Sequence, residues 1–204
     1  PSDRELLVYL PPSYDREPTR RFPLVMVLPG FGSTHHSLLN FRPWEPNLAE
    51  RFERLIASGC PEAILAMPDG FNRWGGSQYI DSPATGDYQR YLAEDVLDEI
   101  DQRFRTLAKR ASRAVVGKSS GGFGALRLGL DRPEKFAVYA SHAGDCAFQL
   151  CILPDLVKTA TVLDNAGGVE AFVARLENQG APRGHGEFHT IMMLGLAAAY
   201  APVD

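Results

Sequence analysis

Short apolar runs alternate with amphipathic helical segments along most of this chain. The run Pro23–Pro29 is apolar at nearly every position, which is typical of a strand covered on both faces. In Tyr88–Phe104, apolar residues recur every three or four positions with acidic residues between them, which predicts a long amphipathic helix. Further strands are predicted at Glu5–Pro12, Ala63–Met67, Ala114–Val116 and Phe136–Ser141, and further helices at Leu48–Ser58 and Phe123–Leu130. This alternation predicts an α/β fold, a parallel sheet with helices on both faces.

The pattern changes after Asp145, beyond which no strand is predicted. Ala147–Val157 is apolar but interrupted by Pro154, and proline does not belong in the interior of a helix. Two helices are predicted in this part of the chain, at Val169–Asn178 and His189–Tyr200. We therefore expect one domain over residues 1–204, with a sheet core in 1–145 and a helical insertion or cap in 146–204.

The clearest motif is Gly-Lys-Ser-Ser-Gly, placed between a predicted strand and a predicted helix. This is the setting of the G-x-S-x-G nucleophile elbow, in which a strained backbone lifts a serine hydroxyl out of the turn. Side chains two positions before and after that serine would collide. Gly117 and Gly121 occupy those positions for Ser119, whereas Ser120 would place Lys118 there. Ser119 is therefore the predicted nucleophile, and a glycine-rich turn without chemistry is the alternative.

Acyl transfer also needs two backbone N–H groups aimed at the developing oxyanion. The residue after the nucleophile supplies one, here Ser120, and a loop after an earlier strand supplies the other. The loop Pro29–Gly32 follows the strand Pro23–Pro29, so the second predicted donor is the N–H of Phe31. An ordinary glycine turn at a strand end is the alternative for this loop.

The composition and net charge of the chain limit the kinds of molecule that it is expected to bind. The chain has 204 residues and a formal net charge of −4, which gives no indication of nucleic acid or an anionic membrane surface as a partner. No apolar run is long enough to span a bilayer, and we expect no cofactor. The start, Pro1–Arg4, has no signal peptide, which favours the cytoplasm, although a removed signal stays open. The three cysteines are expected to fill the core, with a Cys146–Cys151 bridge as the alternative.

Several motifs follow one another in a characteristic order: Val8–Asp15 (VYLPPSYD), Leu28–Gly30, Met67–Gly70 (MPDG), Tyr88–Ile100 and Gly117–Gly122. In this order the chain resembles, from Glu5 to Gly144, the putative-esterase (esterase D-like) branch of the α/β-hydrolases. That branch includes S-formylglutathione hydrolases, feruloyl and enterochelin esterases and mycolyltransferases. The resemblance implies an α/β-hydrolase sheet, a nucleophile at Ser119, and oxyanion donors at Phe31 and Ser120.

The chain departs from that branch in three ways. Pro29 replaces the usual histidine of the oxyanion loop, and Lys118 stands where such esterases often carry histidine or a neutral residue; both leave the acyl group open. The third departure concerns the triad, which runs Ser, then Asp or Glu, then His along the chain in this fold. The resemblance therefore implies that the acid and the base lie beyond Asp204 and that the sheet is truncated before its last strands.

Histidines within the chain are the alternative bases; they are His35, His36, His142, His185 and His189. His142 follows a predicted strand near the site, so it is a candidate for the substrate pocket, and a capped loop histidine is the favoured alternative. His185 and His189 follow Asp145, Asp155 and Asp164 in the triad order, but no strand precedes them. Gly186 spoils a helical histidine pair there, so no metal site is predicted.

Aromatic residues on the loops after the strands are candidates to line an acyl pocket. They are Trp44, Trp74 and Tyr79, of which Trp74 is the preferred pocket residue. Packing of the loops over the core is the alternative interpretation of all three.

Three functional hypotheses follow. The first is a carboxylic ester hydrolase acting on a small-molecule ester through an acyl-enzyme on Ser119. The second is a non-catalytic hydrolase-like module or fragment that associates with a missing C-terminal segment, a second copy or another chain. The third is an acyltransferase of the same fold, which uses the same acyl-enzyme and passes it to an alcohol.

Overall fold

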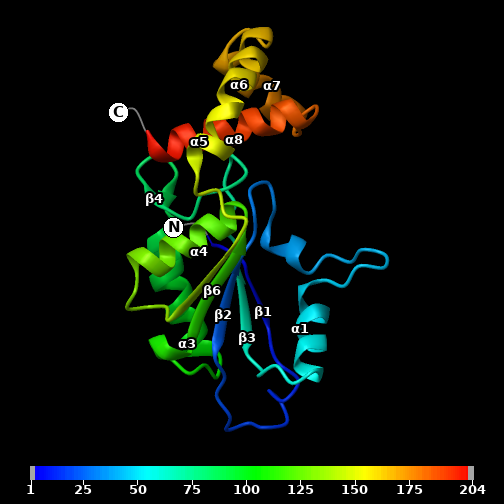
Figure 1. The fold of residues 1–204 in the computed structure, drawn as a ribbon, viewed down its shortest axis with the longest axis vertical. Coiled ribbons are helices and arrows are strands. Elements are labelled where there is room, and N and C mark those ends of the chain that lie inside the picture. The colour runs from blue at the N-terminus through cyan, green and yellow to red at the C-terminus, as the bar shows by residue number, and fades with distance from the viewer. Residues whose placement is uncertain (1–2, 202–204) are drawn as a thin grey trace.

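The computed structural model describes residues 3–201, and its centre is a five-stranded sheet (Figure 1). The strands are β1 (Leu6–Tyr9), β2 (Leu24–Leu28), β3 (Ile64–Pro68), β6 (Arg113–Lys118) and β7 (Val138–His142). Their order across the sheet is β1-β3-β2-β6-β7, with β1 antiparallel to β3 and all other pairs parallel. Because parallel strands share one direction, the ends of β2, β6 and β7 meet at one edge, where the predicted site residues gather.

Helices cover both faces of the sheet, as the sequence predicts. Figure 1 shows α3 (Leu97–Arg103) and α4 (Ser120–Asp131) on one face and α1 (Leu48–Ala57) on the other. The main core forms between the sheet and the α3–α4 layer, where Met26, Val115 and Leu128 are fully shielded from solvent. This core holds the α/β scaffold together and fixes β6 against α4.

The predicted helix Tyr88–Phe104 is present as an unbroken helical stretch over Tyr88–Arg103, but it changes its winding along its length. It consists of α2 (Tyr88–Tyr91), a π-helical turn (Leu92–Val96) and α3. The wider π turn brings Ala93 into the core beside Leu92 and Val96. The loop before it, predicted to lack regular structure, contains a small hairpin of β4 (Asp81–Ser82) and β5 (Gly86–Asp87), strands too short to leave a sequence pattern.

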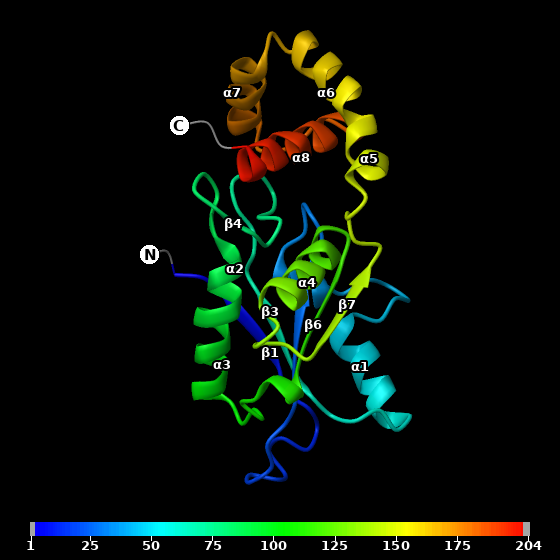
Figure 2. The same cartoon turned by 60° about the vertical axis from the view of Figure 1, so that its left-hand side comes forward.

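Four helices follow β7 and stand over the carboxyl edge of the sheet (Figure 2). They are α5 (Phe148–Cys151), α6 (Leu153–Asn165), α7 (Val169–Gln179) and α8 (His185–Tyr200). Helix α6 is not predicted from the sequence, because Pro154 indicates a break in any helix there. Pro154 lies in the first turn, where the missing N–H is harmless. The predicted start of α8 at His189 was also late by one turn.

Two features of the surface are the positions of the cysteines and the unpaired side of strand β7. All three cysteines, Cys60, Cys146 and Cys151, are exposed and free, so the predictions of core filling and of a disulfide were wrong. Among residues 3–201, strand β7 pairs only with β6, and Val138 and Tyr139 on it are substantially exposed. In the part of the chain that the structure describes, no helix has the length and apolar character needed to cross a membrane.

Candidate active site

Ser119 lies between the end of β6 and the first residue of α4. Its backbone has φ 55° and ψ −124°, a conformation that L-residues other than glycine rarely adopt. The neighbouring strand holds this turn in place, because the N–H of Ser119 donates to the carbonyl of His142 at 2.9 Å. The carbonyl of Ser119 in turn accepts from the N–H of Phe123 at 3.0 Å, which starts the helix. A strained serine is therefore fixed between two rigid elements.

The glycines on either side of Ser119 have no room for a side chain. A Cβ on Gly117 would overlap the carbonyl of Gly121 and lie 2.9 Å from the carbonyl oxygen of Leu28. A Cβ on Gly121 would lie 2.6 Å from the carbonyl carbon of Leu28. Neither glycine has a positive φ, so close backbone approach and not backbone conformation requires glycine at both positions.

The loop after β2 lies directly against the serine. A Cβ on Gly30 would be 3.4 Å from Cβ and 3.9 Å from Oγ of Ser119. A buried tyrosine holds this loop, because the hydroxyl of Tyr79 donates to the carbonyl of Pro29 at 2.7 Å. Within residues 3–201, the N–H groups of Phe31 and Ser120 have no hydrogen-bond acceptor. Two unengaged donors therefore lie on the two segments that meet at Ser119.

Aromatic side chains cover the loop after β2. The Phe31 ring packs edge-on against Phe188 of α8, with ring centroids 5.5 Å apart. Trp74 lies against the same helix, since a Cβ on Gly195 would be 3.1 Å from Cβ of Trp74. Trp44, by contrast, is 100% exposed, so it packs against nothing at the site. The structure thus brings Trp74 and Phe188 to the Phe31 loop.

The hydroxyl of Ser119 has a carboxylate as its neighbour. Its Oγ donates to Oδ2 of Asp145 at 3.2 Å, and Asp145 lies three residues beyond the end of β7. Burial raises the pKa of Asp145, and the hydrogen bond from Ser119 partly offsets this effect. The sequence analysis considered Asp145 only as an acid for the distant histidines. Because β6 and β7 are adjacent parallel strands, residues that follow their carboxyl ends lie close together, and this rule could have placed Asp145 near Ser119.

Among the described residues, no histidine side chain hydrogen-bonds to the hydroxyl of Ser119. His142 is exposed and lines a cavity of about 310 Å³ beside Gly30 and Lys118. His189 on α8 is paired elsewhere, with its Nδ1 2.6 Å from Oδ2 of Asp155. His185 packs edge-on against His189, with ring centroids 4.5 Å apart. His142 therefore lies at the edge of the site, whereas His185 and His189 contact each other and Asp155 within the layer of helices that follows β7.

A strained serine between a parallel strand and a helix, beside a loop with a free N–H, is the arrangement that defines an α/β-hydrolase. The chain belongs to the family described as "Putative esterase", whose model matches residues 1–179. The resemblance noted from the sequence is thereby confirmed. So is the α/β-hydrolase fold, which the structural neighbours share.

Individual relatives agree with this membership. An esterase of Mycobacterium tuberculosis is 32% identical over 97 residues, which make up 47% of this chain and 21% of that protein. A solved structure of a ferulic acid esterase is 26% identical, with a TM-score of 0.57, covering 71% of this chain and 53% of that one. A serine hydrolase of Staphylococcus aureus that binds fluorophosphonate has a TM-score of 0.57 at 20% identity, covering 96% of this chain and 68% of that one. The chain thus spans about a fifth of the length of the Mycobacterium tuberculosis esterase and about half of the length of the ferulic acid esterase.

Proposed function

We propose that this chain carries the nucleophile and oxyanion hole of a serine esterase that hydrolyses carboxylic esters. The observation that carries the proposal is the strained Ser119, set between two backbone donors that no group within residues 3–201 engages. Membership of the esterase family supports the reaction class. Small-molecule esters are the substrates that such a site accepts.

The proposed mechanism uses the groups in the order that acyl transfer requires. Ser119 Oγ attacks the ester carbonyl, and its proton passes to a base. The N–H groups of Phe31 and Ser120 hold the negative oxygen of the tetrahedral intermediate. The intermediate collapses to an acyl-enzyme as the C–O bond to the alcohol breaks and the protonated base returns its proton to the departing oxygen. Water then repeats the sequence and releases the acid. Each backbone donor in such a hole contributes about 3–4 kcal/mol to the transition state.

The base comes, in this proposal, from an Asp–His pair outside residues 3–201. Ser119 Oγ donates to Asp145, which cannot perform both triad roles, and the described histidines are engaged elsewhere or lie beside the cavity. The open edge of β7 offers a place for a further strand, and its exposed Val138 and Tyr139 would be covered by such an addition. We propose that in the resting state the Ser119 hydroxyl keeps its proton and donates it in a hydrogen bond to Asp145.

The aromatic groups near the oxyanion loop suggest the acyl group. Phe31, Trp74 and Phe188 lie together above the loop that is proposed to hold the oxyanion. Aromatic walls of this kind suit a planar aromatic acyl group by stacking. One solved relative is described as a ferulic acid esterase. We therefore propose aromatic acids of the ferulate type as the favoured acyl group, with short-chain esters also accepted.

The test compares ester hydrolysis by the intact natural protein and by its Ser119→Ala variant. With p-nitrophenyl acetate and methyl ferulate, Ser119→Ala is expected to lower kcat by at least about 10⁴-fold, because the acyl-enzyme cannot form. Ser58→Ala is the control, since Ser58 is exposed at the end of α1. Full turnover by Ser119→Ala would refute the assignment.

Two other functions share the same fold, and the same assay separates them. A non-catalytic module is favoured by the bond from Ser119 Oγ to Asp145 where a histidine would be expected. It predicts no turnover of any ester by the intact protein. An acyltransferase predicts that an added alcohol collects most of the acyl group, at the expense of the free acid.

A further inference from the structure

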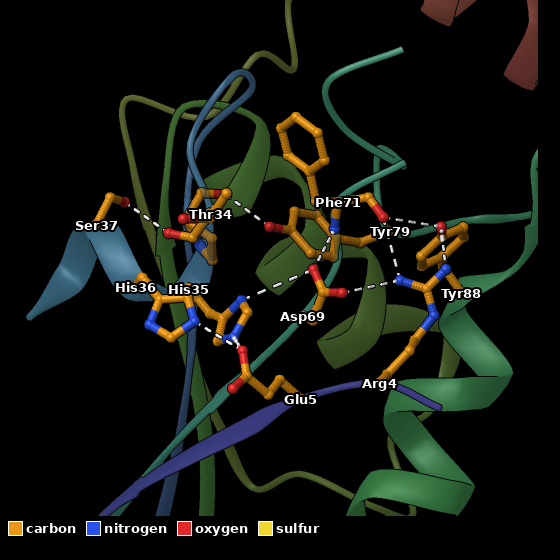
Figure 3. A network of polar contacts seen from close by, with 11 residues as sticks. Arg4, Glu5, Thr34, His35, His36, Ser37, Asp69, Phe71, Tyr79 and Tyr88 are labelled. Atoms are coloured by element: carbon orange, nitrogen blue, oxygen red, sulfur yellow. Dashed lines mark hydrogen bonds and ion pairs between the residues drawn. The ribbon is translucent and has the colours of Figure 1, made fainter. Parts of the chain in front are cut away.

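A cluster of histidine and carboxylate side chains joins the start of β1 to the chain that follows the loop after β2 (Figure 3). Glu5 directly precedes β1, and His35 and His36 open the short 3₁₀ helix His35–Leu38 that follows the loop. One carboxylate oxygen of Glu5 lies 3.2 Å from Nε2 of His35 and 2.7 Å from Nε2 of His36. The ligand atoms of all three residues lie within 4.8 Å of one another. Two imidazoles and a carboxylate therefore converge on one point.

The spacing of these atoms suits a small divalent cation. In a tetrahedral zinc site with bonds of about 2.0–2.1 Å, neighbouring ligand atoms lie about 3.3 Å apart. The pair His35–Glu5 already has this spacing, and the pair His36–Glu5 needs to open by about half an ångström. Glu5 and His36 are exposed, so both can make that adjustment and the ion can enter from solvent.

His35 provides a second, independent observation. It is 5% exposed, and its Nδ1 is buried without a hydrogen-bond partner. That nitrogen points to Oδ1 of Asp69, 3.7 Å away, and Asp69 is itself fixed by Arg4 at 3.3 Å. If a neutral His35 carries its proton on Nε2 and donates to Glu5, then Nδ1 presents a lone pair to the Asp69 carboxylate, which is unfavourable. An imidazolium would donate to both carboxylates. If Nε2 binds a metal, Nδ1 carries the proton and faces its acceptor.

We propose that Glu5, His35 and His36 bind a zinc ion, with water as the fourth ligand, and that Asp69 orients His35 from behind. A carboxylate behind a metal-binding histidine is the usual arrangement, because it fixes both the tautomer and the ring. The ion replaces the protons now shared between Glu5 and the two histidines, so binding releases protons to solvent. Sequence reasoning did not group these residues, since Glu5 lies about thirty positions from the histidines and Asp69 about as far beyond them.

The proposed site has a mechanical consequence. It would join the segment before β1 to the chain that leaves the oxyanion loop, two segments now held together through side-chain hydrogen bonds to Glu5. A ligand that binds only the folded state raises the unfolding temperature with its concentration. The proposed ion therefore stabilises the oxyanion loop and takes no part in ester cleavage, so this inference stands apart from the proposed function.

The test is a titration of metal-free protein with zinc chloride, followed by calorimetry at neutral pH. One ion per chain is expected, with a dissociation constant of about 1 μM or tighter, released by lowering the pH. His36→Gln and Glu5→Gln should each weaken binding at least tenfold, and Asp69→Asn by about 10–100-fold. The first two side chains are exposed, so circular dichroism of the metal-free variants should match that of the parent.

The control is His185→Gln, which removes an exposed histidine from the other histidine pair. It should bind zinc as the parent does. Cobalt in place of zinc should give visible absorption typical of four-coordinate cobalt, lost in His36→Gln. Absence of a one-to-one binding event, equal affinity in His36→Gln, or loss of binding in His185→Gln alone would each overturn the proposal.

Discussion

Tyr79 offers a sharp test of how the loop after β2, which is proposed to supply an oxyanion donor, is held in place. Its ring is almost fully buried between two glycines, since a Cβ on Gly70 would lie 2.6 Å from the ring and a Cβ on Gly124 would overlap it. Its hydroxyl donates to the carbonyl of Pro29, immediately before Gly30 and the proposed donor Phe31. Burial strongly raises the pKa of this phenol, so the hydroxyl remains a donor throughout the neutral and mildly alkaline range.

The variant Tyr79→Phe removes the hydroxyl and keeps the ring. It leaves the buried carbonyl of Pro29 without its donor, which costs about 1–3 kcal/mol of folding free energy. For a chain of this size, each kcal/mol lowers the unfolding temperature by about 2–4 °C, so a decrease of about 2–12 °C is expected. A loop that moves by about 1 Å misplaces the Phe31 N–H, so kcat should decrease by about 10–100-fold with little change in KM.

Thermal unfolding followed by circular dichroism and steady-state kinetics on the intact natural protein measure the two effects. The control is Tyr91→Phe, because Tyr91 on α2 is partly exposed and its hydroxyl makes no hydrogen bond within residues 3–201. Its unfolding temperature and kcat should match those of the parent. If Tyr79→Phe also matches the parent in both measurements, the hydrogen bond to Pro29 does not hold the loop and the reasoning is wrong.

Two further predictions concern the elbow. Gly121→Ala should destabilise the fold by at least about 3 kcal/mol, because its Cβ would meet the backbone of Leu28. Gly186→Ala, in an exposed turn of α8, should be neutral or stabilising by up to about 1 kcal/mol. Chemical denaturation measures the free energy of unfolding of both variants. Asp145→Asn should raise the unfolding temperature near neutral pH. Burial raises the folded-state pKa of Asp145 above that of the unfolded chain, so the penalty for ionisation is present above the folded pKa and disappears as pH falls through it. The difference between parent and variant should therefore close between neutral pH and about pH 4; a constant difference would contradict the assigned cause.

The sheet could be predicted because buried parallel strands are apolar on both faces and leave continuous runs. The run Pro23–Pro29 predicted β2 to within one residue at each end, and the run Ala63–Met67 predicted β3 equally well. The sharp turn at Ser119 between β6 and α4 could be predicted because close packing allows only glycine two positions before and two positions after the serine. In each case a local constraint leaves a local signal in the sequence.

Contacts between distant segments left no such signal. The bond from Tyr79 to Pro29 spans fifty residues, and the bond from Glu5 to His36 spans thirty-one. Asp145 reaches Ser119 only because β7 lies beside β6 in the sheet. The helix α6 was missed for a different reason, since a proline is harmful inside a helix and favourable in its first turn, and the sequence alone did not show where that helix begins.

The chemistry of Ser119 is tested most directly by a fluorophosphonate probe, which forms a covalent bond only with an activated serine. The intact natural protein is treated with the probe, digested, and analysed by mass spectrometry. The account predicts a single labelled peptide, with the added mass on Ser119 and with loss of ester hydrolysis in proportion to labelling. Label on another residue, or continued hydrolysis without any label, would contradict it.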